Sequence, residues 1–231
     1  MKLLRVISII LICWMGSYTF GQKVKVDALN REYEKFRVSD HFDFIHDDFD
    51  TAKLIWVADL TVSFDTIIPG MIGETFNVLK ERSNKMGANA FKVRASNIYD
   101  AGSTKYISIS AFWLHMEDRD SNEVLFRSPE VYVFGFLGYH EEIDGYDIEV
   151  NKDQYVMHAL TYRKRSFAAG DHVNIQLGSK TRGAEVQFKA KEDMVPKFYY
   201  FSMIRGAYKN AIIKEYDKHF GMYLTRILQL E

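Results

Sequence analysis

The segment that decides the fold lies at 53–64 and reads KLIWVADLTVSF. Its second half places an apolar or small residue at every other position, which is typical of a strand with one buried face. A Pro-Gly turn at 69–70 ends this strand. Apolar residues then recur at helical spacing over 72–86, and Gly87 stands where a helix C-cap is expected. The sequence therefore predicts a strand followed by a helix.

Two more strands extend this unit. Residues 90–97 alternate in the same way, and 105–116 form a long strand after a polar turn. A right-handed crossover makes the first two strands parallel, and the hairpin adds an antiparallel third. A short helix is predicted upstream, with Asp27 as N-cap and an apolar face of Leu29, Tyr33 and Phe36. We expect an α+β domain of β-α-β-β order at 23–127.

The C-terminal half has a different pattern. A polar stretch at 117–129 marks the predicted boundary, and residues 128–231 carry short strand-like segments separated by polar or Gly turns. Such spacing favours an antiparallel β-sandwich. From 207 the apolar residues recur at helical spacing, which predicts a C-terminal helix. The strand-like segments are 130–137, 146–150, 155–162, 172–177, 184–190 and 197–203.

Residues 1–22 have the organisation of a cleavable signal peptide. Lys2 and Arg5 give a positive start, and an apolar run at 6–15 follows. This run is too short to span a bilayer, which needs about 20 residues. Small and polar residues then allow cleavage after Gly21 or Gln22. An uncleaved N-terminal anchor is the alternative. We expect an exported protein that is periplasmic, outer-membrane-associated or extracellular.

Composition limits the chemistry of the mature chain. Cys13 is the only cysteine, and it lies inside the signal after Ile12, where a lipobox would need a small residue. The mature chain then has no disulfide, no thiolate metal site and no cysteine nucleophile. The net charge of −1 provides no positive excess for nucleic acid. No later segment is long and apolar enough to predict a transmembrane helix in the mature chain.

The most polar cluster occupies 40–50, DHFDFIHDDFD. Carboxylates and imidazoles are good ligands for hard or borderline cations, so His46, Asp47, Asp48 and Asp50 are candidate ligands for a divalent metal. The spacing matches neither an EF-hand loop nor a pair of His residues one helical turn apart. The alternative is a solvated loop that its phenylalanines anchor to the core. We predict no cofactor, with a divalent metal as the alternative.

Two resemblances to known families appear in the chain. Residues 79–93, LKERSNKMGANAFKV, resemble the small envelope α+β domain of heavy-metal-binding proteins and the Rcs-type outer-membrane stress sensor. This resemblance covers 53–116 and implies the same β-α-β-β fold. The cysteines and Gly-rich loop of some of those proteins are missing here, so metal binding does not carry over.

The ending Phe-Gly-Gln of the predicted signal peptide, at 20–22, resembles export signals of Bacteroidetes-type bacteria.

The second resemblance covers 130–203. The strand at 131–133, the Ile-Glu-Val-Asn run at 148–151 and the Gly-Asp-His-Val turn at 170–173 are similar to lipoprotein-type β-sandwich domains of unknown function. In that family a Pro precedes the glycine of this turn, and here Ala169 replaces it. The resemblance implies an envelope module and names no substrate.

Catalytic motifs do not occur in the sequence. It contains no Gly-x-Ser-x-Gly elbow, Walker loop or dinucleotide fingerprint, so we assign no catalytic residue and lean against an enzyme. We expect a non-enzymatic binding module that interacts with an envelope protein or another surface partner. The alternative is a metal- or small-ligand-binding sensor, or an unfamiliar hydrolase, that uses the segment 40–50.

Overall fold

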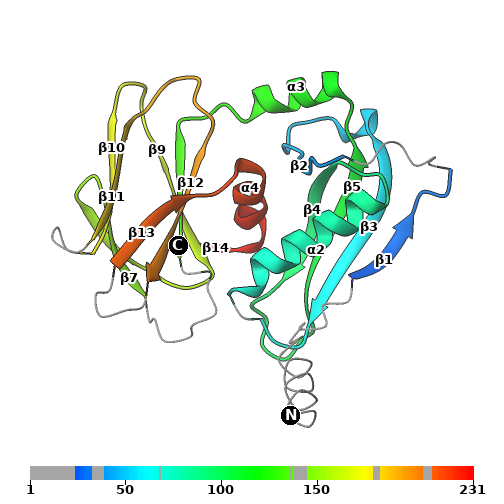
Figure 1. Ribbon diagram of the computed structural model, residues 1–231, viewed down its shortest axis with the longest axis horizontal. Coiled ribbons are helices and arrows are strands. Elements are labelled where there is room, and N and C mark those ends of the chain that lie inside the picture. The colour runs from blue at the N-terminus through cyan, green and yellow to red at the C-terminus, as the bar shows by residue number, and fades with distance from the viewer. Residues whose placement is uncertain are drawn as a thin grey trace, which may run out of the picture.

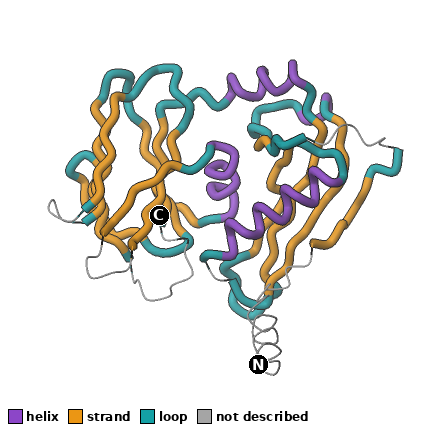
Figure 2. Tube along the Cα trace, in the orientation of Figure 1, coloured by secondary structure: helices purple, strands orange, loops and turns teal. Residues whose placement is uncertain are grey.

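The computed structural model shows a mixed α+β protein that consists mostly of sheet (Figures 1 and 2). It describes residues 24–32, 39–67, 69–135, 137, 145–178, 183–204 and 210–231. In these residues, 14 strands form three sheets, and three α-helices accompany them. No helix in this part of the chain is long and apolar enough to cross a membrane. The predicted α+β class is confirmed.

The first sheet contains the predicted β-α-β-β unit. Strands β3 and β4 both run antiparallel to β5, which lies between them, so β3 and β4 are parallel to each other as predicted. Helix α2 crosses one face of this sheet (Figure 1) and buries Ile72, Phe76 and Leu79. The elements are β3 (Ile55–Phe64), α2 (Met71–Lys85), β4 (Ala90–Asn97) and β5 (Lys105–Trp113), with β2 (Asp43–Phe44) and β1 (Val24–Leu29) at the two edges.

The prediction of a helix capped by Asp27 is wrong over the residues described. Residues 24–29 form strand β1, which pairs antiparallel with β3. Val24 and Val26 are half-buried and alternate with exposed neighbours, and this period of two outweighs the capping signal. Leu29 is 49% exposed and so does not belong to a buried helix face. The remaining members of that face, Tyr33 and Phe36, lie outside the described residues.

A helix also stands where only a polar connection was expected. Strand β5 ends at Trp113, before the predicted end at 116, and helix α3 (Met116–Leu125) follows. Glu117 and Asp118 lie in its first turn, where they complement the helix dipole. The only residue that α3 itself buries is Asn122, so its sequence lacks the apolar stripe that would have predicted it.

The remaining strands form two sheets with a common core. One has the order β11-β10-β7-β8 and the other β13-β12-β6-β9-β14. Between them lie the buried side chains of Val133, Ile148, Ile175 and Phe201, among others. The strands are β6 (Glu130–Phe134), β7 (Tyr146–Val150), β8 (Asp153–Met157), β9 (Thr161–Ser166), β10 (His172–Leu177), β11 (Ala184–Lys189), β12 (Lys197–Ile204), β13 (Asn210–Glu215) and β14 (Gln229–Leu230).

Two details of this half differ from the expectation. The sheet of order β13-β12-β6-β9-β14 is mixed, because β12 pairs parallel with β6 and β14 pairs parallel with β9. The chain passes through the four-stranded sheet between β6 and β12, and such a long crossover permits parallel pairing. The strand expected at 155–162 is divided into β8 and β9 at Leu160, whose φ of 62° is incompatible with a strand.

The C-terminal helix is shorter than predicted. Residues 210–215 form strand β13, and α4 (Lys218–Ile227) begins only after Asp217, whose carboxylate accepts hydrogen bonds from the backbone N–H groups of His219 and Phe220. Helix α4 lies between the first sheet and the sheet that contains β12 (Figure 1). Its Met222, Tyr223, Leu224 and Ile227 belong to one buried cluster together with Phe91 from β4 and Phe198 from β12. The largest core therefore draws on both halves of the chain.

Candidate functional site

The segment 40–50 runs along the edge of the first sheet, and its candidate ligands have partners within the chain. His46 Nδ1 accepts a hydrogen bond from the backbone N–H of Asp48 at 3.2 Å. Asp47 forms an ion pair with Arg226. Asp50 caps a short 3₁₀-helix, η1 (Thr51–Lys53). In the described part of the chain, no three His, Cys, Asp or Glu side chains are grouped so that they could hold a metal ion. The metal site stays a prediction.

A buried ionic cluster lies directly beside these residues. Asp43 in β2 is 5% exposed. Its Oδ2 lies 2.6 Å from Nε of Arg119 in α3, and its Oδ1 lies 3.4 Å from Nε2 of His219 in α4. An ion pair between Lys218 and Glu123 joins the same two helices. The cluster thus connects β2, α3 and α4.

His219 is held in one tautomer by its neighbours. The backbone N–H of Phe44 donates to Nδ1 at 2.9 Å, so Nδ1 carries no proton and Nε2–H faces Asp43. Burial lowers the pKa of His219 below its ordinary value, although the Asp43 carboxylate acts in the opposite direction. The side chain is only 13% exposed, and both ring nitrogens face groups of this chain. The pair therefore acts as a structural clamp rather than an acid–base centre that faces a substrate.

Asn122 completes the attachment of α3 to the sheet edge. Its Nδ2 donates to the carbonyl oxygen of Phe44 at 3.0 Å, and its Oδ1 accepts from the backbone N–H of His46 at 2.8 Å. The carboxamide thus bonds to the strand edge as a neighbouring strand would. This edge of the sheet is closed by a side chain, which removes a site for unwanted pairing.

The sequence analysis missed Arg119, Asn122 and His219 as members of one cluster. Phe44 and His219 are 175 residues apart, and no local pattern marks such a contact. The one signal in the sequence is a charged residue, Asp43, between the two apolar residues Phe42 and Phe44, all three of which are buried. A carboxylate at such a position needs a cationic or hydrogen-bonding partner from elsewhere in the chain.

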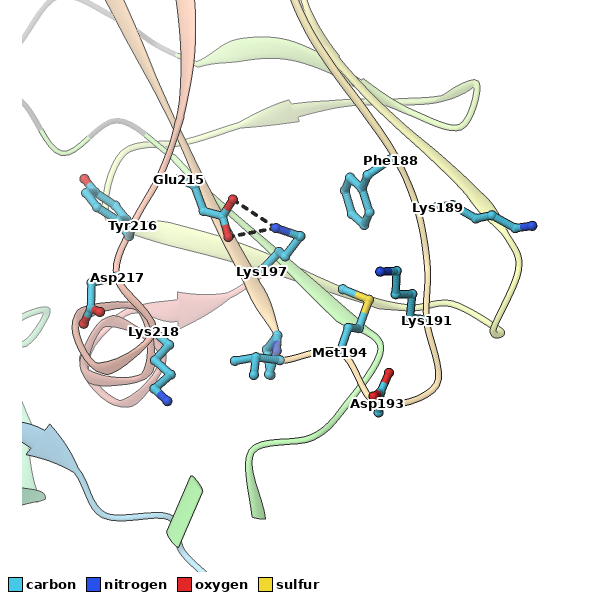
Figure 3. Close-up of a pocket in the computed structure, with 12 residues that line it drawn as sticks. Phe188, Lys189, Lys191, Asp193, Met194, Lys197, Glu215, Tyr216, Asp217 and Lys218 are labelled. Carbon is cyan, nitrogen blue, oxygen red and sulfur yellow. Dashed lines mark hydrogen bonds and ion pairs between the residues drawn. The ribbon is translucent and has the colours of Figure 1, made fainter. Parts of the chain in front are cut away.

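An open groove lies at the end of the two sheets, next to the start of α4 (Figure 3). Its volume is about 850 Å³. The end of β11, the loop before β12 and the end of β13 supply the walls. Apolar side chains contribute much of the lining, and Val195 is 38% exposed. They are Phe188, Met194, Val195, Pro196 and Tyr216.

The charges of the groove divide into paired and unpaired groups. Lys197 pairs with both oxygens of Glu215 at 3.0 and 3.1 Å (Figure 3) and also lies over the ring of Phe188. Lys189 and Lys191 lie at the end of β11 and just beyond it, and the described residues include no ion-pair partner for either. Lys191 lies beside Met194, whereas Lys189, which alternates with Phe188 along β11, points away from the groove (Figure 3). The exposed Asp193 also belongs to the lining, and the described residues include no ion-pair partner for it. The groove therefore combines an apolar lining with the unpaired charges of Lys191 and Asp193.

Comparisons with known proteins provide no neighbour for this chain, since no family model, curated protein or solved structure matches it.

Proposed function

We propose that the protein is an exported, non-enzymatic binding protein of the cell envelope and that the groove beside α4 receives a segment of a partner protein. The single observation that carries the proposal is the contrast between the two sites. The titratable groups of the buried ionic cluster are engaged with one another, whereas the open concavity presents apolar side chains and the free ammonium group of Lys191. Concavities that are lined by apolar side chains and a few polar groups are typical of binding sites.

The chemistry of the groove indicates the kind of partner segment. Met194 and Val195 offer contacts to aliphatic or aromatic side chains, and Lys191 attracts a carboxylate. We therefore infer a segment that carries both apolar and acidic side chains. The resemblance of 53–116 and 130–203 to envelope domains supports a role outside the cytoplasm, as does the signal-like order of residues 1–22. In this proposal, 23–127 and 128–231 are two domains of one binding protein.

A photo-crosslinking experiment in the native envelope tests this proposal. Benzoylphenylalanine replaces Val195 in the groove, and the matched control carries it at Val124, which is 54% exposed on α3. We expect one dominant crosslinked envelope protein from Val195 and none from Val124. Reversal of charge by Lys191→Glu should reduce the yield at least fivefold. Equal labelling from both positions, or a yield that ignores the reversal, would refute the groove as the binding site.

Export is tested separately. Cell fractionation should place the protein outside the cytoplasm, and N-terminal sequencing should give a mature chain that starts at Gln22 or Lys23. A cytoplasmic full-length chain would disprove the export proposal without bearing on the groove.

A further inference from the structure

The outer face of the four-stranded sheet carries an ordered set of polar side chains. In the strand register, Gln176 of β10 lies directly opposite Glu185 of β11 and Glu149 of β7. Glu149 in turn lies opposite Gln154 of β8. Residues directly opposite each other in neighbouring strands point to the same face. Carboxylates and amides therefore alternate in one row across all four strands. At an inter-strand spacing of about 4.8 Å, this row spans about 14 Å.

This face is also hollowed. Two depressions of about 720 and 470 Å³ adjoin each other and share Glu149 and Gln176 in their linings. Together they form a trough along the polar row. Volumes of this size are in the range that small-molecule sites occupy. The opposite face of the same strands is apolar and buried in the core, so the backbone beneath the trough is held rigidly.

Hydrogen bonds within the chain orient the polar groups before any ligand arrives. Gln154 Nε2 donates to Glu149 Oε2 at 3.1 Å, and Gln187 Nε2 donates to Glu185 Oε1 at 2.7 Å. At one end of the trough, Asn151 bridges to β10 through its carboxamide. Its Nδ2 donates to the carbonyl oxygen of His172, and its Oδ1 accepts from the backbone N–H of Asn174. Each glutamate still has lone pairs free for a ligand.

The geometry points to a neutral oligosaccharide as the ligand of this trough. A sugar hydroxyl both donates and accepts, and it is matched by a surface on which carboxylate acceptors alternate with amides that do both. Phosphate, sulfate and acidic sugars are disfavoured, because Asp147, Glu149 and Glu185 outnumber the single lysine of the lining, Lys152. The length of the row fits a chain of several sugar rings. This inference goes beyond the groove and does not depend on it.

Affinity electrophoresis with the full mature protein tests the inference. Native gels contain a soluble neutral polysaccharide, in turn a β-glucan, a galactomannan or an arabinoxylan, and mobility gives the dissociation constant. We expect retardation by at least one of them. Gln176→Ala and Glu149→Gln should each weaken that binding at least tenfold. The first removes a carboxamide from the shared centre of the trough, and the second replaces a charged acceptor there by a neutral amide. Glu117→Gln, on the exposed side of α3, is the matched control and should bind as the wild type does.

Three results would overturn the inference: no retardation by any of the polysaccharides, retardation that Gln176→Ala and Glu149→Gln leave unchanged, or capture of a fluorescent oligolysine peptide in place of the polysaccharides. The last result would assign the face to a cationic protein segment. Circular dichroism confirms that both variants are folded. Crosslinking from Val195 is unaffected by these surface changes, so failure of the trough and failure of the groove can be told apart.

Discussion

At Gly221, helix α4 touches the ring of Phe198 in β12. A methyl group added at this glycine would lie 2.2 Å from Cγ of Phe198, well inside van der Waals contact. Alanine normally favours a helix over glycine by about 1 kcal/mol, but overpacking a core costs about 1–3 kcal/mol. Because three atoms of the Phe198 ring lie within 2.7 Å, the cost falls at the upper end of this range. We expect Gly221→Ala to lower the free energy of unfolding by about 2 kcal/mol in urea titrations.

Gly73 in α2 is the matched control for this prediction. A methyl group there would meet only Cζ of Phe220 at 3.9 Å, an ordinary contact. Gly73→Ala should therefore stabilise the protein by about 0.5–1 kcal/mol, the helix-propensity difference alone. If Gly221→Ala stabilised the protein as much as Gly73→Ala does, α4 would not approach β12 as closely as described.

His219 makes stability depend on pH. Burial holds the pKa of His219 in the folded protein below its unfolded value of about 6.5. Between these two pKa values the unfolded chain binds more protons, so the free energy of unfolding falls as pH drops below about 6.5 and levels off below the folded pKa. Protonation of Nδ1 would also remove the acceptor of the Phe44 N–H.

The variant His219→Asn isolates this effect. Asparagine places an oxygen, Oδ1, at the position of the acceptor Nδ1 but does not titrate, so the fall in the urea midpoint between pH 7 and pH 5 should become shallower. A midpoint profile identical to that of the wild type would show that folding does not lower the pKa of His219.

At the scale of elements, α3 is held to the sheet chiefly by polar side chains. Asn122→Ala leaves the Phe44 carbonyl and the His46 N–H without their partner in a buried position. Each unsatisfied group costs about 1–3 kcal/mol, and we expect a loss of at least 2 kcal/mol together with faster hydrogen exchange in β2. Asp120→Ala, on the exposed side of the same helix, should change stability by less than about 0.5 kcal/mol. Similar losses in both variants would contradict this attachment.

The elements that the sequence predicts well have a clear local pattern and clear end signals. Strand β4 begins and ends as predicted, and α2 buries Ile72, Phe76 and Leu79, which recur at helical spacing in the sequence. Helix α3 has no apolar stripe, and β1 is a half-buried edge strand close to a good capping residue, so neither has a clear local signal. The ionic cluster could not be predicted at all, since Asp43 and His219 are brought together only by tertiary packing.

At the scale of the whole molecule, α4 makes the two predicted domains depend on one helix. The same cluster that contains Leu60 and Phe91 of the first sheet contains Tyr223 and Ile227 of α4 and Phe134 of β6. Tyr99 adds a polar link, since its hydroxyl donates to the Leu160 carbonyl and accepts from the Gln229 N–H, and burial raises its pKa to about 12.

A truncation tests this dependence. A chain that ends at 216 exposes apolar surface on both remaining parts, and at about 25 cal/mol per Å² even 200 Å² of lost burial costs about 5 kcal/mol. We expect the truncated protein to bind hydrophobic dyes and to lose its cooperative urea transition, while the full chain unfolds in one step by tryptophan fluorescence and circular dichroism. A truncated chain whose first half kept a cooperative transition at the wild-type midpoint would disprove the dependence.

The place of α4 near the end of the sequence has a consequence for biosynthesis. Residues 218–230 supply helix α4, which packs into the largest core, and strand β14, which adds to the edge of β9. Until residues 218–230 have been synthesised, a nascent chain lacks the helix that its first hundred residues need for burial. The first sheet therefore reaches its final packing only after α4 has been made.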